Sequence, residues 1–496
     1  MNIAIVSISN LFTRFGSVFL SILIMPLYLN ILGPDAYGLI GVYNTLLVIV
    51  SFFDFGYSGV ILQEAAKAKI PLGKAEIKAL GNLVRTVEIA AILIAVVFPS
   101  IGYLVTTKYF KNSIAINGGK QEDIKLWVGI LFIAATAKLP MGVYNSLLVG
   151  LNRQFVANSI NFLSNIIRGG LTLFVISQVD SSLRGFFLSQ LVSNLIEMCA
   201  LMLTVWRFLP ERFFRSSFNI SVLIVHKKFA SGIVLIAVSA AMVGQLDRLL
   251  LVMSVSMREF GYFTLASTIA GGILNLVYPF TSTLAPVFTR HRFESVEKTR
   301  RIYSQSTSVI ILLVVPFALS VYLNSSDILI MYLGDPLHAN SINPILKVLL
   351  IGTLPMTFTP IAHVLLVSHG KLKIISFLNL AYFLAYGIVL TWFSSKVELA
   401  KILAYWVVFN FIYFAVLIFS AYATANENMS GFFYWFYKTL LMPILWTVMC
   451  GVVVHYIVNW FLLPKIIKYF IEYTSILILC IASTWKSFLG VIKNFN

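Results

Sequence analysis

Long apolar segments recur along the whole chain, separated by short polar stretches. Each segment is about 20 residues long, the length that a helix needs to cross the hydrocarbon core of a bilayer. The gaps between them, at most about 20 residues, are too short for an independent folding unit. We therefore predict an all-α integral membrane protein with roughly fourteen transmembrane helices. The predicted spans are 8–32, 38–62, 84–107, 126–150, 158–179, 185–208, 231–254, 259–287, 305–324, 343–367, 374–395, 397–422, 438–462 and 467–490.

Polar residues inside these spans follow helical spacing. On the first span they step by three and four, which places them on one face of the helix. The stripes are Ser7, Asn10, Arg14, Ser17 and Ser21; Asn44, Ser51, Asp54 and Ser58; Asn158, Asn161, Asn165, Arg168 and Thr172; Gln190, Ser193, Asn194 and Glu197. Single polar residues are explained by hydrogen bonds between helices. Whole stripes on neighbouring spans instead predict a shared polar cavity.

Nine ionisable residues also fall inside the apolar segments. They are Arg14, Lys138, Arg168, Arg248 and Lys347, with Asp54, Glu88, Glu197 and Asp247. A charge at bilayer depth costs at least about 2.5–3.5 kcal/mol, so such residues face a bundle interior or a watered cavity. They are candidates for functional contacts, with structural salt bridges as the alternative.

A weak internal repeat predicts two lobes. Residues 33–38 read Gly-Pro-Asp-Ala-Tyr-Gly, and residues 256–261, about 223 positions later, read Ser-Met-Arg-Glu-Phe-Gly. Each half holds an even number of spans, so the halves would be parallel repeats about an axis normal to the membrane. We predict an N-terminal six-helix lobe at 1–208, a cytoplasmic linker at 209–230, a C-terminal six-helix lobe at 231–422, and two additional helices within 423–496.

Six prolines lie within the predicted spans, where each frees backbone carbonyl groups that neighbours or water must satisfy. We expect kinks at these positions, some of them hinges. The prolines are Pro26, Pro140, Pro279, Pro316, Pro355 and Pro360.

Composition supports the membrane assignment and gives an orientation. The chain is 59% hydrophobic and 11% charged, against roughly 25% charged residues in soluble domains. Its net charge is +17. The two largest clusters of Lys and Arg are 207–228 and 290–301, and cytoplasmic loops carry such an excess of Lys and Arg. This places the N-terminus in the cytoplasm and makes nucleic acid an unexpected partner. The three cysteines all lie in spans, so neither a disulfide framework nor a metal-ligand spacing is expected.

Several short motifs resemble those of a known family. Residues 32–39 (Leu-Gly-Pro-Asp-Ala-Tyr-Gly-Leu), 53–56 (Phe-Asp-Phe-Gly) and 63–67 (Gln-Glu-Ala-Ala-Lys) are similar to the N-terminal signature of Wzx-type polysaccharide flippases. Residues 148–153 (Leu-Val-Gly-Leu-Asn-Arg) and 245–248 (Gln-Leu-Asp-Arg) are similar to later landmarks of that family.

The resemblance implies a member of the multidrug/oligosaccharidyl-lipid/polysaccharide (MOP) exporter superfamily. Such proteins have a MATE-like fold, with two six-helix lobes around a central polar cavity and often two extra C-terminal helices. They move undecaprenyl-diphosphate-linked oligosaccharide repeat units, for O-antigen or capsule, from the cytoplasmic to the periplasmic leaflet of the bacterial inner membrane. Membrane lipids, a polysaccharide polymerase and a chain-length regulator are the implied partners.

The residues inside the spans suit that substrate. Arg pairs with phosphate through a planar fork, so we predict that Arg14, Lys138, Arg168 and Arg248 contact the diphosphate or an acidic sugar. Amides supply both donors and acceptors for sugars, and the predicted sugar contacts are Asn10, Asn158, Asn161 and Asn165. Carboxylates inside transporters often relay protons or bind Na⁺, so the candidates for ion coupling are Asp54, Glu88, Glu197 and Asp247.

Two other functions stay open at this point. A drug/cation antiporter of the same superfamily would need an acid-dominated binding lobe, against which the basic Arg14 and Arg168 stripes argue. A membrane polysaccharide polymerase or glycosyltransferase would usually carry a large external loop, and the outer loops here are short. We therefore predict a transporter and not an enzyme, with no catalytic or metal-ligating residues and no cofactor beyond a coupling H⁺ or Na⁺.

Overall fold

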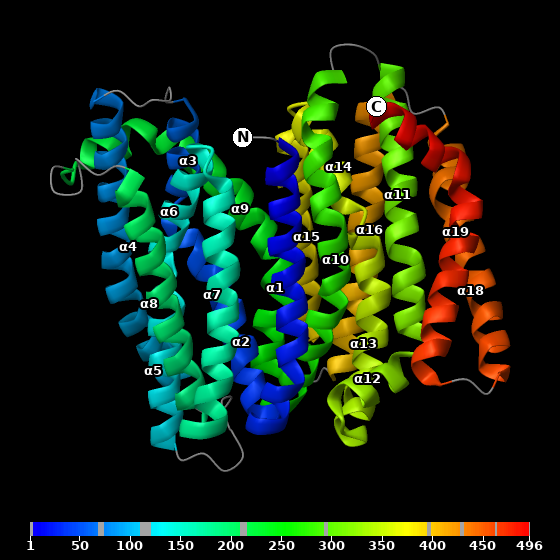
Figure 1. Cartoon of the computed structure of the whole chain (residues 1–496), viewed down its shortest axis with the longest axis horizontal. Helices are drawn as coiled ribbons and strands as arrows, with labels where there is room; N and C mark the ends of the chain where they lie inside the picture. The colour runs from blue at the N-terminus through cyan, green and yellow to red at the C-terminus, as the bar shows by residue number, and fades with distance from the viewer. Residues whose placement is uncertain are drawn as a thin grey trace. The chain divides into compact units, whose positions relative to one another are not determined.

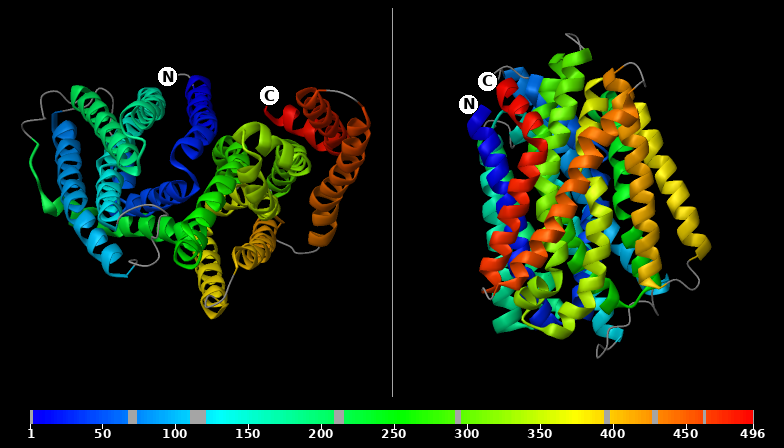
Figure 2. Two further views of the ribbon diagram at one scale, coloured as in Figure 1. Left: turned by 90° about the horizontal axis from the view of Figure 1, so that it is seen from below. Right: turned by 90° about the vertical axis from the view of Figure 1, so that its right-hand side faces the viewer.

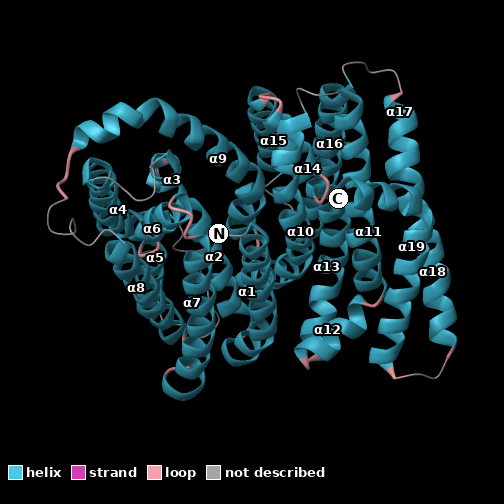
Figure 3. Cartoon of the chain, turned by 45° about the horizontal axis from the view of Figure 1, so that its top comes forward, coloured by secondary structure: helices cyan, strands magenta, loops and turns pink. Residues whose placement is uncertain are grey.

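A computed structural model describes residues 3–67, 74–109, 121–208, 216–291, 296–393, 398–426, 431–461 and 464–495. The side chains of residues 3–12 and 14 and of some residues in other helices are outside this description. The described residues form helices joined by short turns, with no strand among them (Figure 3). Fourteen of the described segments are long and apolar enough to cross a membrane. Each corresponds to one predicted span, so the predicted all-α fold is confirmed.

The chain divides into two compact units, residues 1–264 and 265–496. The helices of the first unit are coloured from blue to green in Figure 1. They are α1 (Ile3–Leu32), α2 (Pro34–Val50), the 3₁₀ turn η1 (Ser51–Asp54), α3 (Tyr57–Lys67), α4 (Lys74–Tyr109), α5 (Gln121–Thr136), α6 (Leu139–Gly150), α7 (Gln154–Phe174), the π-turn η2 (Val175–Val179), α8 (Leu183–Phe208) and α9 (Ile220–Ser254).

The helix α10 (Met257–His291) crosses the boundary between the two units. The second unit continues to the end of the described chain. Its other elements are α11 (Val296–Leu323), α12 (Ser325–Leu333), α13 (Pro336–Met356), α14 (Thr359–Ser368), α15 (Leu372–Phe393), α16 (Leu399–Asn426), α17 (Phe432–Trp435), the π-turn η5 (Phe436–Leu441), α18 (Met442–Trp460) and α19 (Lys465–Phe495).

An apolar core in the first unit joins α3, α4, α6 and α8. Val60, Val84, Val143 and Leu201 are all fully buried in it. The helix α9, which covers part of the predicted linker and the start of the predicted C-terminal lobe, packs against α2, α3 and α4 of the first unit. The Tyr57 hydroxyl, for example, donates to the carbonyl oxygen of Leu223 at 2.9 Å.

The second predicted span, 38–62, is interrupted and does not form one helix. Phe55 and Gly56 adopt left-handed backbone conformations, with φ of 49° and 75°, which end η1 and redirect the chain into α3. Asp54 stabilises this turn, since its Oδ1 accepts the backbone N–H of Gly56 at 2.8 Å. A Cβ on Gly56 would also lie 2.6 Å from the carbonyl oxygen of Ala230, so glycine is required there on two counts.

Proline breaks the fourth and the tenth spans in the same way. Pro140 and Pro360 each lie in the first turn of a new helix, α6 and α14, after an irregular turn at 137–138 and 357–358. Proline lacks the N–H that would bond the carbonyl four residues earlier, so the helix divides there. Pro26, Pro316 and Pro355, in contrast, lie inside continuous helices. The shared break supports the predicted repeat, because it recurs at corresponding places in the two halves of the chain.

The two segments that suggested this repeat also contact one another. A Cβ on Gly38 would collide with the backbone carbonyl of Met257, and a Cβ on Gly261 would collide with that of Pro34. The Arg258 guanidinium reaches Asp35, with Nη2 and Oδ2 3.4 Å apart. The start of α2 and the start of α10 therefore cross through a reciprocal pair of glycine contacts.

Candidate functional site

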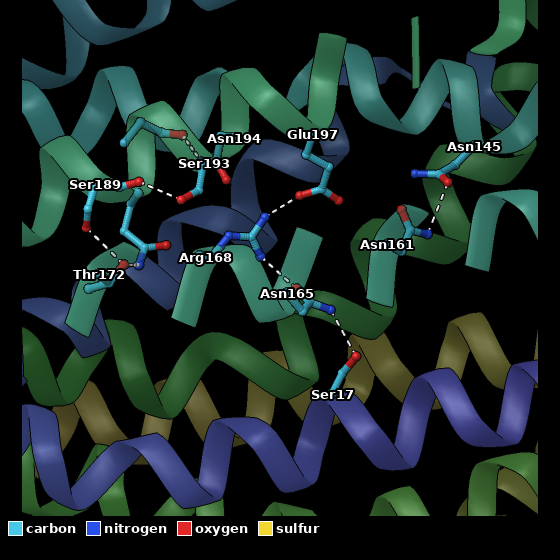
Figure 4. Close-up of polar contacts among 12 residues, drawn as sticks. Ser17, Asn145, Asn161, Asn165, Arg168, Thr172, Ser189, Ser193, Asn194 and Glu197 are labelled. Atoms are coloured by element: carbon cyan, nitrogen blue, oxygen red, sulfur yellow. Dashed lines mark hydrogen bonds and ion pairs between the residues drawn. The ribbon is translucent and has the colours of Figure 1, made fainter. Parts of the chain in front are cut away.

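Arg168 is the centre of a polar cluster in the first unit (Figure 4). Its Nη2 forms an ion pair with Oε2 of Glu197 on α8, and its Nη1 donates to Oδ1 of Asn165 at 2.9 Å. Asn165 in turn donates to the hydroxyl oxygen of Ser17 on α1 at 2.9 Å. The side chains of Arg168 and Glu197 are 15% and 10% exposed. The ion pair is therefore largely, but not completely, buried.

Amide and hydroxyl groups extend the cluster along α7 in both directions (Figure 4). One turn beyond Arg168, the Thr172 hydroxyl oxygen accepts from Ser189 at 2.9 Å and from Gln190 at 3.0 Å. In the other direction, Asn161 donates to Oδ1 of Asn145 on α6 at 3.1 Å. The spacing of three to four residues puts all these α7 side chains on one face.

A second cation, Lys138, lies within the electrostatic reach of this ion pair. It sits in the irregular turn between α5 and α6 and interacts with the charges of Arg168 and Glu197. The Asn194 side chain fixes this region, since it donates to the carbonyl oxygen of Ala134 at 2.8 Å. The Lys138 ammonium makes no hydrogen bond or ion pair with the described residues. Two cations and one carboxylate thus leave the cluster with one surplus positive charge.

Unused hydrogen-bonding groups remain in the cluster. Among the described residues, the buried Nε of Arg168 and Oδ1 of Asn161 have no partner. Buried polar atoms normally find partners in the protein or in water. The cluster therefore offers N–H donors beside a positive charge, and amide acceptors one to two turns away.

Glu88 is held by a different set of partners. Its Oε1 accepts the Tyr144 hydroxyl at 2.6 Å, and its Oε2 accepts from Arg85 at 3.0 Å. The carboxylate is buried beside the apolar core of the first unit. The ion pair of the buried Glu88 with Arg85 needs all its hydrogen bonds to offset the free-energy cost of removing the charges from water.

Replacing Tyr144 with Phe is expected to lower the stability of the protein by about 1–3 kcal/mol, because one buried carboxylate oxygen loses its donor. The thermal unfolding midpoint of the purified protein measures this. Tyr57→Phe is the control, since that half-buried hydroxyl donates only to a backbone carbonyl. Equal midpoints for Tyr144→Phe and the wild type would contradict the contribution of the Tyr144–Glu88 contact.

The remaining predicted residues are dispersed. Asp54 caps the η1 turn, and Asn158 lies on the cluster's helix, where its carbonyl oxygen accepts from Thr13 at 3.5 Å. Asp247 and Arg248 lie on α9, and the buried Asp247 Oδ1 has no partner among the described residues. Asn10 and Arg14 lie on α1, with their side chains outside the described residues. In the second unit, the Lys347 ammonium sits over the Tyr322 ring, 5.4 Å from its centroid.

The sequence analysis missed three partners of these groups: Asn145, Tyr144 and Arg85. Tyr144 and Asn145 are adjacent on α6 yet serve different networks, because neighbouring side chains on a helix point about 100° apart. The only sequence signal for Tyr144 and Asn145 was that they are polar residues within an otherwise apolar span. No three His, Cys, Asp or Glu side chains in the described parts of the chain come together to hold a metal ion.

The chain matches a known protein family over its first part, and its fold resembles solved structures. The family described as polysaccharide biosynthesis protein matches residues 1–292. The fold resembles that of the lipid II flippase MurJ in an inward closed conformation, with a TM-score of 0.71 at 13% identity over 97% of this chain and 99% of that chain. An inward-facing multidrug resistance MATE family transporter of the MOP superfamily gives 0.60 at 14% identity, over 85% and 99%.

The Vibrio cholerae MATE transporter VcmN in its bent form gives a TM-score of 0.54 at 14% identity, over 86% of this chain and 98% of that chain. No curated protein matches the chain in sequence. At these identities the structural likeness concerns the fold, and the predicted MATE-like architecture is confirmed at that level.

Proposed function

We propose that this chain, which belongs to the polysaccharide biosynthesis protein family, is a flippase for undecaprenyl-diphosphate-linked oligosaccharide repeat units. It moves them by alternating access from the cytoplasmic to the periplasmic leaflet of the bacterial inner membrane, with its N-terminus in the cytoplasm. The repeat units serve O-antigen or capsule assembly.

The observation that carries this proposal is the surplus positive charge of the Arg168 cluster. A diphosphate needs cationic donors, and Arg168 Nε and the Lys138 ammonium are both without partners among the described residues. The oligosaccharide needs amides and hydroxyls, which Asn161, Asn165 and Thr172 supply on the same helix face. Glu197 keeps Arg168 in place between substrates by occupying one side of its guanidinium.

The same geometry disfavours a drug/cation antiporter as the function. A cationic drug would need an acidic site, whereas Glu197 is already neutralised by Arg168 and the neighbouring Lys138 repels cations. Coupling to H⁺ or Na⁺ would use Asp247, whose buried oxygen has no partner in the described residues, before Glu88, which is fully engaged.

Deleting the gene in its host is expected to halt surface polysaccharide and to accumulate lipid-linked repeat units in the cytoplasmic leaflet. The measurement is the proportion of labelled lipid-linked sugar that a membrane-impermeant enzyme can reach in oriented vesicles. Restoring the wild-type chain should return that sugar to the outer leaflet. Accumulation in the outer leaflet in the absence of the protein would instead indicate a polymerase or a later step, and would refute the flippase assignment.

A further inference from the structure

The last two membrane helices hold a second polar cluster, inside the second unit. The helices α18 and α19 pack on each other and on α11 (Figures 1 and 2). Glu472 on α19 is 1% exposed within this three-helix contact. A carboxylate so buried in a membrane span is costly unless it is paired or protonated.

Glu472 bridges the three helices through both of its oxygens. Its Oε1 accepts from Nδ2 of Asn324, the residue that follows α11, at 2.9 Å. Its Oε2 lies 3.2 Å from Nδ1 of His455 on α18. The carboxylate therefore links α19 to the end of α11 and to α18, and its contact with α18 runs through an imidazole that can carry a proton.

The other ring nitrogen of His455, Nε2, lies next to an exposed residue. Nε2 lies 3.1 Å from Nδ2 of Asn459, which is exposed one turn further along α18. With a neutral ring, Nδ1–H donates to Glu472 and Nε2 accepts from the Asn459 amide. When a proton binds Nε2, a rotation of that amide presents its oxygen as acceptor, and the Nδ1–H bond to Glu472 is kept.

The bound proton changes the electrostatics of the helix contact. With it, the imidazolium and the carboxylate form a neutral ion pair; without it, the pair carries one buried negative charge that only neutral donors stabilise. Removing one partner's charge from a buried pair is strongly destabilising. The pair therefore stabilises the packing of α19 while the imidazole carries the proton, and this contribution is lost when the proton leaves.

We propose that His455 and Glu472 form a proton-binding site that controls how tightly α19 packs on α11. The site is separate from the Arg168 cluster of the first unit, and it gives the two additional helices a role in sensing pH. The proposal does not depend on which substrate the protein transports.

The other charged groups around His455 and Glu472 do not explain a loss of stability as pH rises. Asp327 on α12 accepts from Lys465 at 2.9 Å and from Tyr469 at 3.0 Å. The Lys465 hydrogen bond holds the pKa of Asp327 below its usual range, so Asp327 stays ionised at neutral pH. Lys468 donates to the carbonyl oxygen of Asn459 at 3.4 Å.

Among the described residues of α12, α13, α18 and α19, the one further histidine is His338 on α13. Its Nε2 lies 3.5 Å from Oδ2 of Asp335, so it too is a histidine beside a carboxylate. Lys347, also on α13, lies over the Tyr322 ring. A variant of His338 therefore serves as the internal control for any pH effect assigned to His455.

The test is the thermal unfolding midpoint of the full chain in lipid nanodiscs between about pH 5 and pH 9, a range that brackets the histidine titration. The wild-type midpoint is expected to fall by several degrees as pH rises through this range. Glu472→Gln should remove that fall, because the amide keeps a partner for Asn324 and carries no charge. Glu398→Gln, which changes an exposed carboxylate 3.9 Å from Lys401, and His338→Gln should both keep the wild-type profile.

A second variant and a second measurement distinguish loss of the proton-binding site from a general folding defect. His455→Gln should also abolish the wild-type pH profile, because the imidazole that takes up the proton is absent. Cys480, fully buried further along α19, should react faster with a membrane-permeant maleimide at high pH in the wild type than in Glu472→Gln at the same pH. A wild-type pH profile in both variants, or equal Cys480 labelling rates, would overturn the proposal.

Discussion

Replacing both Arg168 and Glu197 with glutamine is expected to abolish surface polysaccharide in a complementation assay while the protein still folds. The double change removes the charge that we propose contacts the substrate. It does so without leaving Glu197 as an unpaired buried carboxylate, which alone would cost about 3–5 kcal/mol. Arg168→Ala is likewise expected to abolish the polysaccharide, but Glu197 then lacks its ion-pair partner. The measurements are cell-surface polysaccharide and the amount of folded protein in the membrane.

Single variants separate a substrate contact from a structural salt bridge. Glu197→Gln frees the guanidinium, so export should persist if Arg168 binds the anionic substrate, and Arg168→Lys should reduce export because the planar fork is lost. Arg184→Ala, at an exposed position on α8, is the control and should export normally. Normal polysaccharide from the Arg168/Glu197 double variant would exclude Arg168 from substrate binding.

Adding a methyl group at Gly38 or at Gly261 is expected to destabilise the protein by about 1–3 kcal/mol, the usual cost of overpacking. Each Cβ would collide with a backbone carbonyl, of Met257 or of Pro34, and a backbone atom cannot move aside as a side chain can. The thermal unfolding midpoint of purified Gly38→Ala and Gly261→Ala measures the effect.

Gly271→Ala on the same helix, α10, is the matched control. A Cβ there has no heavy atom within 4 Å, so this variant should be neutral, or more stable by up to about 1 kcal/mol through helix propensity. If all three alanine variants unfolded at the same temperature, the reciprocal contact between the starts of α2 and α10 would contribute nothing to stability.

The motifs that resembled a family are explained in part by packing. Gly150 lies in the 148–153 motif, and a Cβ there would come within 2.6 Å of the Ala65 Cβ, which lies in the 63–67 motif. Asn152 ends the turn after α6 with φ of 58°. These motifs therefore mark places where helices approach closely or turn sharply. Arg168 and the polar stripe of α7 lie outside them.

The candidate site was only partly predictable. The α7 stripe correctly grouped Asn161, Asn165 and Arg168, because side-chain direction on a helix follows from spacing alone. Residue spacing does not show which helix lies opposite that stripe. Arg168 meets Glu197, 29 positions away, whereas Glu88, predicted in the same class as Glu197, meets Tyr144 and Arg85.

The sequence by itself determined the number of membrane spans and the polar face of each helix. Both are local properties, since a span must be apolar over about 20 residues and must satisfy its own backbone hydrogen bonds. Only the tertiary structure decided where Pro140 and Gly56 redirect the chain, and which charges become partners. The pairing of His455 with Glu472 and Asn324 depends on how three helices are rotated against each other, and no single helix contains that information.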